Sequence, residues 1–311
     1  MQPDPRRPFC ADISAEIAEP LTATASHVEH WVLVEYRGLW SRDVLGGSLV
    51  SERVKVVLRE QLATLPRSRL LFIRRPERRG REGRMVYLAR STEEGSALRA
   101  LEVGHVDDLV GLDLGAHAQS VDHPLFVACT HGKRDRCCAR YGRPLYDRVR
   151  DATEEGWVWQ STHVGGDRFA GNLIGLPHGL TFGRVGADDV WPLLDEYFAG
   201  RIYLDRYRGR SCYAFPVQAA EHSVRSEAAA TDIDDLRLVS STRSGPASWT
   251  VRVLVRSSGE VHEVRVVREA GALTYLTCDA LELRHPRRYV AARPRLVSDR
   301  RREGSPRGPA A

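Results

Sequence analysis

The stretch HPLFVACTHGKRDRCCARYGRPLYDRVR, residues 123–150, holds three of the chain's six cysteines and opens its most informative run of elements. LFVACT, residues 125–130, is a short apolar run typical of a buried strand. RPLYDRVRDATEE, residues 143–155, has helical spacing, with its proline where a first helical turn tolerates one. The stretch therefore predicts a strand, a charged loop that carries Cys137 and Cys138, and a helix.

The segments that follow continue this alternation of elements. They are the strand WVWQST (157–162), the strands NLIGLP (172–177) and LTFGRV (180–185), and the helix DDVWPLLDEYFAG (188–200). The last two strands are joined by the short link His178–Gly179, which predicts a hairpin. Strand, helix, strand, hairpin and helix is the element order of a thioredoxin-like α/β domain, which we place at residues 119–212.

The region before it, residues 1–118, predicts a smaller α/β layer. Its elements are the strand WVLVEY (31–36), the helix SERVKVVLREQLATL (51–65) with a serine at its N-cap, and the strands LLFIRR (70–75) and RMVYLAR (84–90). The arginine-rich run RRPERRGREGR, residues 74–84, joins the last two strands. It predicts an exposed hairpin loop.

The region after it, residues 213–298, predicts a helix followed by a three-stranded meander. The elements are the helix VQAAEHSVRSEAAA (217–230) and the strands SWTVRVLVRSS (248–258), EVHEVRVVREA (260–270) and ALTYLTCDA (272–280). Cys278, at the end of the last strand, is expected to be a buried packing residue. Residues 299–311, rich in proline, glycine and arginine, predict a disordered tail.

Composition narrows the class of protein. The chain has 311 residues, of which 42% are hydrophobic and 28% charged, as in ordinary globular proteins. Six cysteines are too few for a secreted disulfide scaffold, and the N-terminus lacks the apolar core of a signal peptide. No apolar stretch is long enough to span a membrane. We therefore expect a cytoplasmic protein with no membrane association.

The net charge of +5 comes almost entirely from arginine, because only two residues are lysine. The arginines are scattered apart from the loop at 74–84 and the tail. The distribution argues against a specific nucleic-acid surface. The net positive charge would still favour association with an acidic protein partner.

Two loops carry the candidate chemistry. One follows LFVACT, and the other, HVGGDRFAGN at residues 163–172, follows WVWQST. Loops that leave neighbouring strands at the same edge of a sheet face each other, so we expect their side chains to converge. Thiolates and imidazoles are the ligands that zinc and iron–sulfur centres select. The side chains expected to lie together are Cys129, His131, Cys137, Cys138, His163 and Asp167.

The remaining residues of the second loop suit such a site. Gly165 and Gly166 allow a tight bend and a close approach to a bulky group. Arg168 and its neighbouring arginines would offset the negative charge of a thiolate-bound group. A phosphate-binding nest is an alternative for this loop, but no helix begins directly after it. A disulfide within the Cys137–Cys138 pair would need strained geometry.

At these residues the sequence resembles a known family. CTHGKRDRCCARYGRP and STHVGGDRFAGN are similar to motifs of the sucrase/ferredoxin-like family, whose members carry a thioredoxin-like [2Fe-2S] ferredoxin domain. Further similarity lies in EPLTATA (19–25), WVLVEYRGLWSRDVL (31–45), and YRGRS with QAAE near residues 207–221. The resemblance extends over residues 10–225 and is weaker in the C-terminal meander.

The resemblance implies a ligand set. Fungal members of the family hold their cluster with two cysteines nine positions apart and two histidines. The matching residues here are Cys129, Cys138 and His163, whereas Asp167 stands at the position of the second histidine. Asp167 is then the fourth ligand, with Cys137 or the absence of a stable cluster as alternatives. His131, Gly165, Gly166 and Arg168 would line the cluster.

The function implied is that of a one-electron carrier rather than an enzyme. Its partners would be redox proteins, namely a reductase and an acceptor. A thiol–disulfide oxidoreductase that uses Cys129 is one alternative, although the sequence contains no C-x-x-C motif. A structural zinc site is another. The sucrase part of the family name implies no glycosidase, because no pair of carboxylates at a sugar site is evident.

Overall fold

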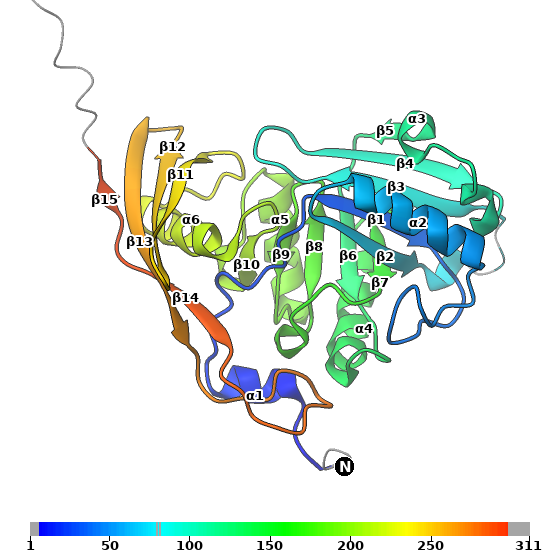
Figure 1. Cartoon of the computed structure of the whole chain (residues 1–311), viewed down its shortest axis with the longest axis horizontal. Helices are drawn as coiled ribbons and strands as arrows, with labels where there is room; N and C mark the ends of the chain where they lie inside the picture. The colour runs from blue at the N-terminus through cyan, green and yellow to red at the C-terminus, as the bar shows by residue number, and fades with distance from the viewer. Residues whose placement is uncertain (1–5, 79, 81, 298–311) are drawn as a thin grey trace, which may run out of the picture.

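A computed structural model of the chain describes residues 6–78, 80 and 82–297, and shows two β-sheets with helices packed against them (Figure 1). The helices are α1 (Cys10–Glu16), α2 (Glu52–Thr64), α3 (Leu114–His117), α4 (Arg136–Asp151), α5 (Val190–Phe198) and α6 (Phe215–Ala228). The first ten strands are β1 (His30–Glu35), β2 (Ser68–Arg74), β3 (Arg84–Arg90), β4 (Ala97–Val103), β5 (Gln119–Val121), β6 (Leu125–Cys129), β7 (Val158–Ser161), β8 (Leu173–Leu176), β9 (Leu180–Phe182) and β10 (Tyr207–Arg210). The predicted α/β class is confirmed.

The ten strands form one sheet, in the order β10-β9-β8-β6-β7-β2-β1-β3-β4-β5. It contains two β–α–β units with parallel strands, β1–α2–β2 and β6–α4–β7. The two units meet where β2 pairs antiparallel with β7. The regions expected at 1–118 and 119–212 therefore share a sheet, and the boundary between them stays a prediction.

Helix α2 forms as its sequence indicates. The Ser51 hydroxyl accepts a hydrogen bond from the backbone N–H of Val54, which satisfies one donor of the first turn. Val54 and Leu58 are fully buried on the face that packs over β1 and β2. The helix thus covers one face of its half of the sheet.

Helix α4 begins earlier than predicted. It starts at Arg136 rather than Arg143, because the Asp135 carboxylate accepts a hydrogen bond from the backbone N–H of Cys137 at 2.9 Å and caps the helix. The predicted proline of the first turn, Pro144, lies inside the helix instead. Both adjacent cysteines therefore lie in a helical turn and not in a loop, and their side chains have helical directions.

The arginine-rich run at 74–84 does not close a hairpin. Strands β2 and β3, which it joins, lie on opposite sides of β1. Five of the six residues of β1 are buried, as expected for a strand that lies between two neighbours, β2 and β3. Within the run, Arg78 lies 3.3 Å from the buried carboxylate of Glu35, so it is not simply a solvated charge.

The predicted hairpin at His178–Gly179 is confirmed. Strands β8 and β9 pair antiparallel, and Gly179 takes the positive φ of +69° that the turn requires. Helix α5 follows and packs, with α4, on the apolar face that contains Phe126 and Leu173. These elements hold the ends of β6 and β7 in place.

The second sheet lies against α6 (Figure 1). Its strands are β11 (Leu236–Gly245), β12 (Ser248–Val255), β13 (Glu260–Ala270), β14 (Arg287–Ala291) and β15 (Arg295–Leu296), in the order β11-β12-β13-β14 with β15 also on β13. The predicted meander contained β12 and β13 and missed β11. The tail predicted at 299–311 lies outside the described residues.

The third predicted strand of that meander, residues 272–280, is wrong. The segment is a loop with one isolated bridge, between Thr274 and Arg284. The backbone N–H of Cys278 donates a hydrogen bond to Asp135 at 2.7 Å, so the segment leaves the sheet and packs beside α4 and α1. Long-range contacts outweigh its strand-like sequence here.

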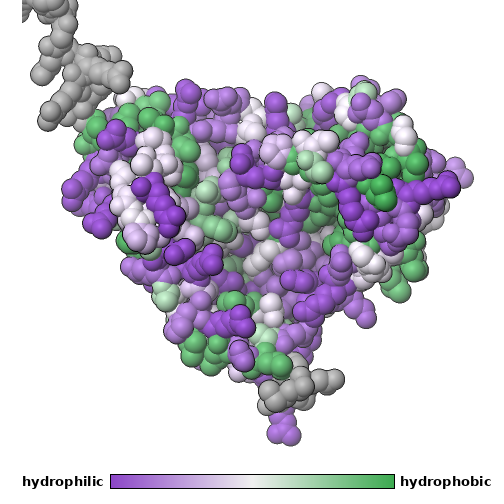
Figure 2. All heavy atoms as spheres, viewed as in Figure 1, coloured by the Kyte–Doolittle hydropathy of each residue, from purple (hydrophilic) through white to green (hydrophobic). Residues whose placement is uncertain are grey.

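One face of the molecule is strongly polar. Figure 2 shows a face on which hydrophilic residues predominate and hydrophobic ones occur in separate patches. Among the described residues, no helix has both the length and the apolar character needed to cross a membrane.

Candidate metal centre

The first half of the site is the junction of β6 and α4. Cys129 ends β6, is 1% exposed, and donates its backbone N–H to the carbonyl of Asn172 at 3.1 Å. Helix α4 crosses so close that a Cβ atom at Gly142 would lie 1.8 Å from the Cys129 carbonyl oxygen. Only glycine permits this approach, and it brings the first turn of α4, with Cys138, next to Cys129.

The second half is the loop after β7. Because β7 runs parallel to β6, with Ser161 opposite Cys129, this loop begins at the same edge of the sheet. The ligand atoms of Cys129, Cys138 and His163 lie within 4.8 Å of one another. The loops therefore converge as the sequence predicts.

The diglycine turn places Asp167 in the same cluster. Gly166 has a φ of +79°, and a Cβ atom there would lie 2.3 Å from the guanidinium of Arg208. The turn brings Asp167 Oδ1 to 2.9 Å from His163 Nδ1 and 3.4 Å from Cys138 Sγ. Asp167 thus lies next to two members of the group, His163 and Cys138.

Two arginines that the sequence analysis did not single out support this loop. Arg208, 1% exposed, donates to the Gly165 carbonyl at 3.0 Å and to the Asn172 side chain at 2.7 Å. Arg69, which is half-buried, donates to the His163 carbonyl at 2.7 Å. Arg208 belongs to the motif YRGRS, which resembles the family and so offered a signal. For Arg69 the sequence has no such signal, because its partner lies more than ninety positions away.

His131 lies beside the cluster and orients it. Its Nδ1 atom accepts a hydrogen bond from the backbone N–H of His163 at 3.2 Å. Its Nε2 atom is buried and has no hydrogen-bond partner among the described residues. His163 Nδ1 is also buried and, although close to Asp167, lies outside hydrogen-bond geometry. A buried polar nitrogen left without a partner costs about 1–3 kcal/mol, so a bound group would relieve a penalty here.

The other predicted residues are near the cluster but have different partners. Arg168 forms an ion pair with Glu19 at 2.8 Å, and its guanidinium lies 4.5 Å from the centre of the Phe169 ring. Its charge is therefore offset by a carboxylate of the EPLTATA segment. Gly165, with a φ of +100°, faces the hydroxyl of Ser26.

The electrostatics of the cluster favour charge on Cys129, His163 and Asp167, whereas Cys129 and burial raise the pKa of Cys138 well above its usual value. The neighbouring Cys138 lowers the pKa of Cys129 most, and His163 lowers it further. Together they hold this pKa well below its usual value, although burial raises it. Burial alone would lower the pKa of His163, but Asp167 and Cys129 raise it to about 9. Burial would raise the pKa of Asp167, but the close contact with His163 outweighs burial and the pKa is lowered. Thiolate and carboxylate are the forms that bind metals.

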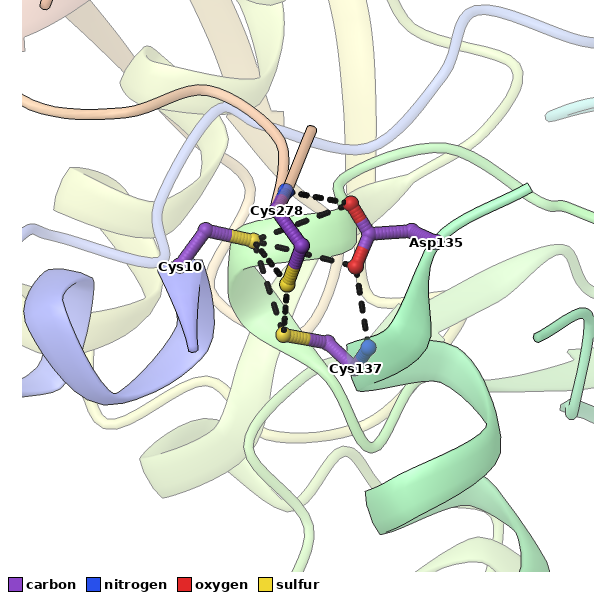
Figure 3. Close-up of side chains that lie close together, drawn as sticks. All are labelled: Cys10, Asp135, Cys137 and Cys278. Atoms are coloured by element: carbon purple, nitrogen blue, oxygen red, sulfur yellow. Dashed lines mark hydrogen bonds between the residues drawn. The ribbon is translucent and has the colours of Figure 1, made fainter. Parts of the chain in front are cut away.

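Cys137 lies in a different cluster. Successive residues of an α-helix point about 100° apart, so Cys137 and Cys138 face different neighbours. Cys137 Sγ is 3.5 Å from Cys10 Sγ and 3.2 Å from Cys278 Sγ (Figure 3). This placement disfavours Cys137 as the fourth ligand of the first cluster. Cys278 is buried as expected, but it lies in a turn among other cysteines rather than at a strand end.

Comparisons with known proteins agree with the motifs. A family model described as sucrase/ferredoxin-like matches residues 21–209. Altered inheritance of mitochondria protein 32 of Meyerozyma guilliermondii is 36% identical over 102 residues, which covers 29% of this chain and 36% of the relative. The protein of the same name from Debaryomyces hansenii is 30% identical over 101 residues, covering 29% of this chain and 37% of the relative. The matches thus span little more than a third of either relative. No solved structure matches this chain.

Proposed function

Because this chain belongs to the sucrase/ferredoxin-like family, we propose that it is a one-electron carrier whose [2Fe-2S] cluster is held by Cys129, Cys138, His163 and Asp167. The observation that carries the proposal is the convergence of two thiols and an imidazole within 4.8 Å, next to a buried carboxylate. When bound, such a cluster supplies a one-electron redox couple.

The residues present fit that group. Iron–sulfur centres accept a donor set of two cysteines on one iron and two non-thiolate ligands on the other. The buried Nδ1 atom of His163 forms no well-aligned hydrogen bond and lies 2.9 Å from Asp167, so loss of its proton would make it available to a metal. Aspartate is a harder donor than imidazole, but the lowered pKa of Asp167 keeps it in the anionic form that can bind iron.

The surrounding residues hold the ligands in position. His131 and Arg69 bind the backbone of His163 on its N–H and its carbonyl. Arg208 and Asn172 bind the carbonyls of the diglycine turn. Partners of this kind orient metal ligands and commonly change metal affinity by about 10–100-fold when removed.

The proposed site is buried except at His163, so electrons would be exchanged there. Cys129 and Cys138 are 1% and 0% exposed, whereas the side chain of His163 is 17% exposed. A redox partner would therefore dock over His163, and the excess of arginine favours a partner with an acidic surface. The reductase and the acceptor are proposed as such partners.

The element order and the cysteines support two further parts of the proposal. Strand, helix, strand, hairpin and helix follow one another from β6 to α5, which supports a thioredoxin-like unit. All six cysteines are free, which suits a reducing compartment such as the cytoplasm.

A second candidate is a thiol–disulfide oxidoreductase. The lowered pKa of Cys129, with Cys138 as hydrogen-bond donor, is typical of a nucleophilic thiol beside a resolving one. Against this function, both thiols are buried, and a disulfide substrate would have to reach them. We therefore place it second.

The test is to purify the full chain without oxygen. We expect a coloured protein with about two irons and two sulfides per chain. A colourless protein that holds zinc at Cys129 and Cys138, or only reactive thiols there, would overturn the proposal.

A further inference from the structure

A second cluster of metal-binding side chains lies outside the proposed [2Fe-2S] site. It consists of Cys10 in α1, Asp135 and Cys137 at the start of α4, and Cys278 in the loop between β13 and β14 (Figure 3). All four ligand atoms lie within 4.8 Å of one another, and all four residues are buried. We propose that this cluster binds one zinc ion.

The sulfur separations fit a single ion. The three Sγ–Sγ distances are 3.5 Å for Cys10–Cys137, 3.2 Å for Cys137–Cys278 and 3.7 Å for Cys278–Cys10. Zinc–sulfur bonds of about 2.3 Å in a tetrahedron place sulfurs about 3.8 Å apart. A disulfide joins two sulfurs at about 2.05 Å and would leave the third thiol unused. The nearly regular triangle of sulfurs corresponds to three corners of a tetrahedral zinc site.

Asp135 occupies the position of the fourth ligand. Its oxygens lie 4.0 and 3.9 Å from Cys10 Sγ. Each oxygen accepts one backbone hydrogen bond, from Cys137 at 2.9 Å and from Cys278 at 2.7 Å, and keeps a lone pair for a metal. A carboxylate anchored in this way is held toward the three sulfurs.

A backbone hydrogen bond and the helix dipole act in favour of a thiolate at Cys137, although Cys278 and burial raise the pKa of this thiol in the metal-free chain. The backbone N–H of Ala11 points at Cys137 Sγ at 3.4 Å. Cys137 is the second residue of the sixteen-residue helix α4, where the helix dipole stabilises negative charge. Three thiolates and a carboxylate enclosed together would repel one another strongly, and a divalent cation removes that repulsion.

The sequence positions of the ligands indicate what the ion does. Cys10 is 127 positions from Cys137, and Cys278 is a further 141 positions away. Helix α1 has only seven residues and no side-chain N-cap bond, and the loop between β13 and β14 has a single bridge. Neither segment is stable by itself, so zinc would link both of them to the first turn of α4.

The zinc ion would lie next to the proposed [2Fe-2S] site, but it would share no ligand with that site. Cys137 precedes Cys138, so a metal on Cys137 restrains the same helical turn that supplies Cys138 to the other cluster. The inference goes beyond the proposed electron transfer, because it uses no ligand of the [2Fe-2S] site and stands if that site proves empty.

The experiment measures zinc and iron in the full chain purified without oxygen and without chelators. We expect about one zinc per chain, lost in Cys10→Ser and in Cys278→Ser while the iron and the visible spectrum remain. Cys129→Ser should lose iron and keep zinc. Cys212→Ser, which changes the one cysteine outside both clusters, should keep both metals. Failure of the electron-carrier proposal would appear as missing iron, and failure of this one as missing zinc.

Cobalt provides a readout that needs no change to the second cluster. The metal-free Cys129→Ser chain, titrated with Co²⁺, should develop thiolate-to-cobalt absorption that saturates at about one equivalent. Metal analysis would overturn the proposal if the full chain lacks zinc, if the Cys10→Ser/Cys278→Ser double variant retains it, or if Cys129→Ser holds iron in place of zinc. A disulfide among the three cysteines would also overturn it. So would the absence of the cobalt absorption.

Discussion

Cys137 and Cys138 are neighbours in one turn of α4, yet they belong to different clusters. Cys138 lies with Cys129 and His163, which the two motif loops bring together. Cys137 lies with Cys10 and Cys278, which come from opposite ends of the described chain. The pair teaches that adjacent cysteines in a sequence need not join the same cluster of side chains, because a helix turns their side chains about 100° apart.

The two clusters also differ in donors and exposure. The first mixes two thiols with an imidazole and a carboxylate, and its His163 side chain is 17% exposed. The second has three thiols and a carboxylate, and its cysteines are at most 1% exposed. A closed, thiolate-rich set is typical of structural metal sites. A mixed set with one exposed edge suits exchange of electrons with a partner.

The largest expected effect separates the adjacent cysteines. Cys138→Ala should abolish iron incorporation, because it removes a ligand of the first cluster. Cys137→Ala should leave the visible spectrum largely intact and remove zinc instead. Absorption spectra and metal analysis of the two variants check this. If Cys137→Ala bleaches the protein while Cys138→Ala does not, the assignment of the two residues is reversed.

The next effect concerns stability. Selective removal of zinc should lower the free energy of unfolding by about 3 kcal/mol when free zinc had exceeded its dissociation constant about 100-fold. Hydrogen exchange should rise first in α1 and in the loop at 271–286, which contact α4 through the second cluster. The Cys10→Ser/Cys278→Ser double variant, which should hold no zinc, serves as the control and should not change on the same treatment. Protection that is unchanged in these two segments would show that the ion does not hold them.

A smaller effect is expected at His131. His131→Ala removes the acceptor of the His163 backbone N–H, so iron affinity should fall by about 10–100-fold with the ligands themselves unchanged. His117→Ala, at an exposed position, should leave it unchanged. Competition with an iron chelator measures both. Equal iron retention in the two variants would remove His131 from any role in positioning.

The smallest effect is a titration. In the metal-free chain, Cys129 should remain a thiolate at neutral pH, because Cys138 and His163 lower its pKa despite burial. The thiolate form exists above the lowered pKa, so ultraviolet thiolate absorption at pH 7 should decrease in Cys129→Ser. It should stay the same in Cys212→Ser, because burial raises the pKa of Cys212 to about 12. A decrease in Cys212→Ser, with none in Cys129→Ser, would contradict the ionised state described for the first cluster.

Local sequence patterns were sufficient to predict many of the elements from β6 to α5. The strand ending at Cys129, the strand at 158–161 and the hairpin at Gly179 were all predicted, because period and turn chemistry act over a few residues. The convergence of Cys129, Cys138 and His163 followed from the same reasoning, because parallel neighbouring strands present their following loops at one edge.

Other features depended on partners far along the chain. The cap of α4 was missed because Asp135 lies in a charged run that resembles a loop. The segment 272–280 has strand-like alternation, but its amide at Cys278 bonds to Asp135 instead of to a neighbouring strand. Arg208 binds the Gly165 carbonyl of the diglycine turn, and the motif YRGRS around it does not reveal this partner, which lies 43 positions away.

The sequence by itself therefore determined which thiol, imidazole and carboxylate side chains follow β6 and β7, and in what order. Those residues lie between positions 129 and 167, in the two motifs that follow β6 and β7, where the spacing in the sequence gives the position on a strand or helix. Only the tertiary structure decided that Cys137 joins Cys10 and Cys278. Their proximity results from packing between segments more than a hundred positions apart, and local periodicity has no information at that range.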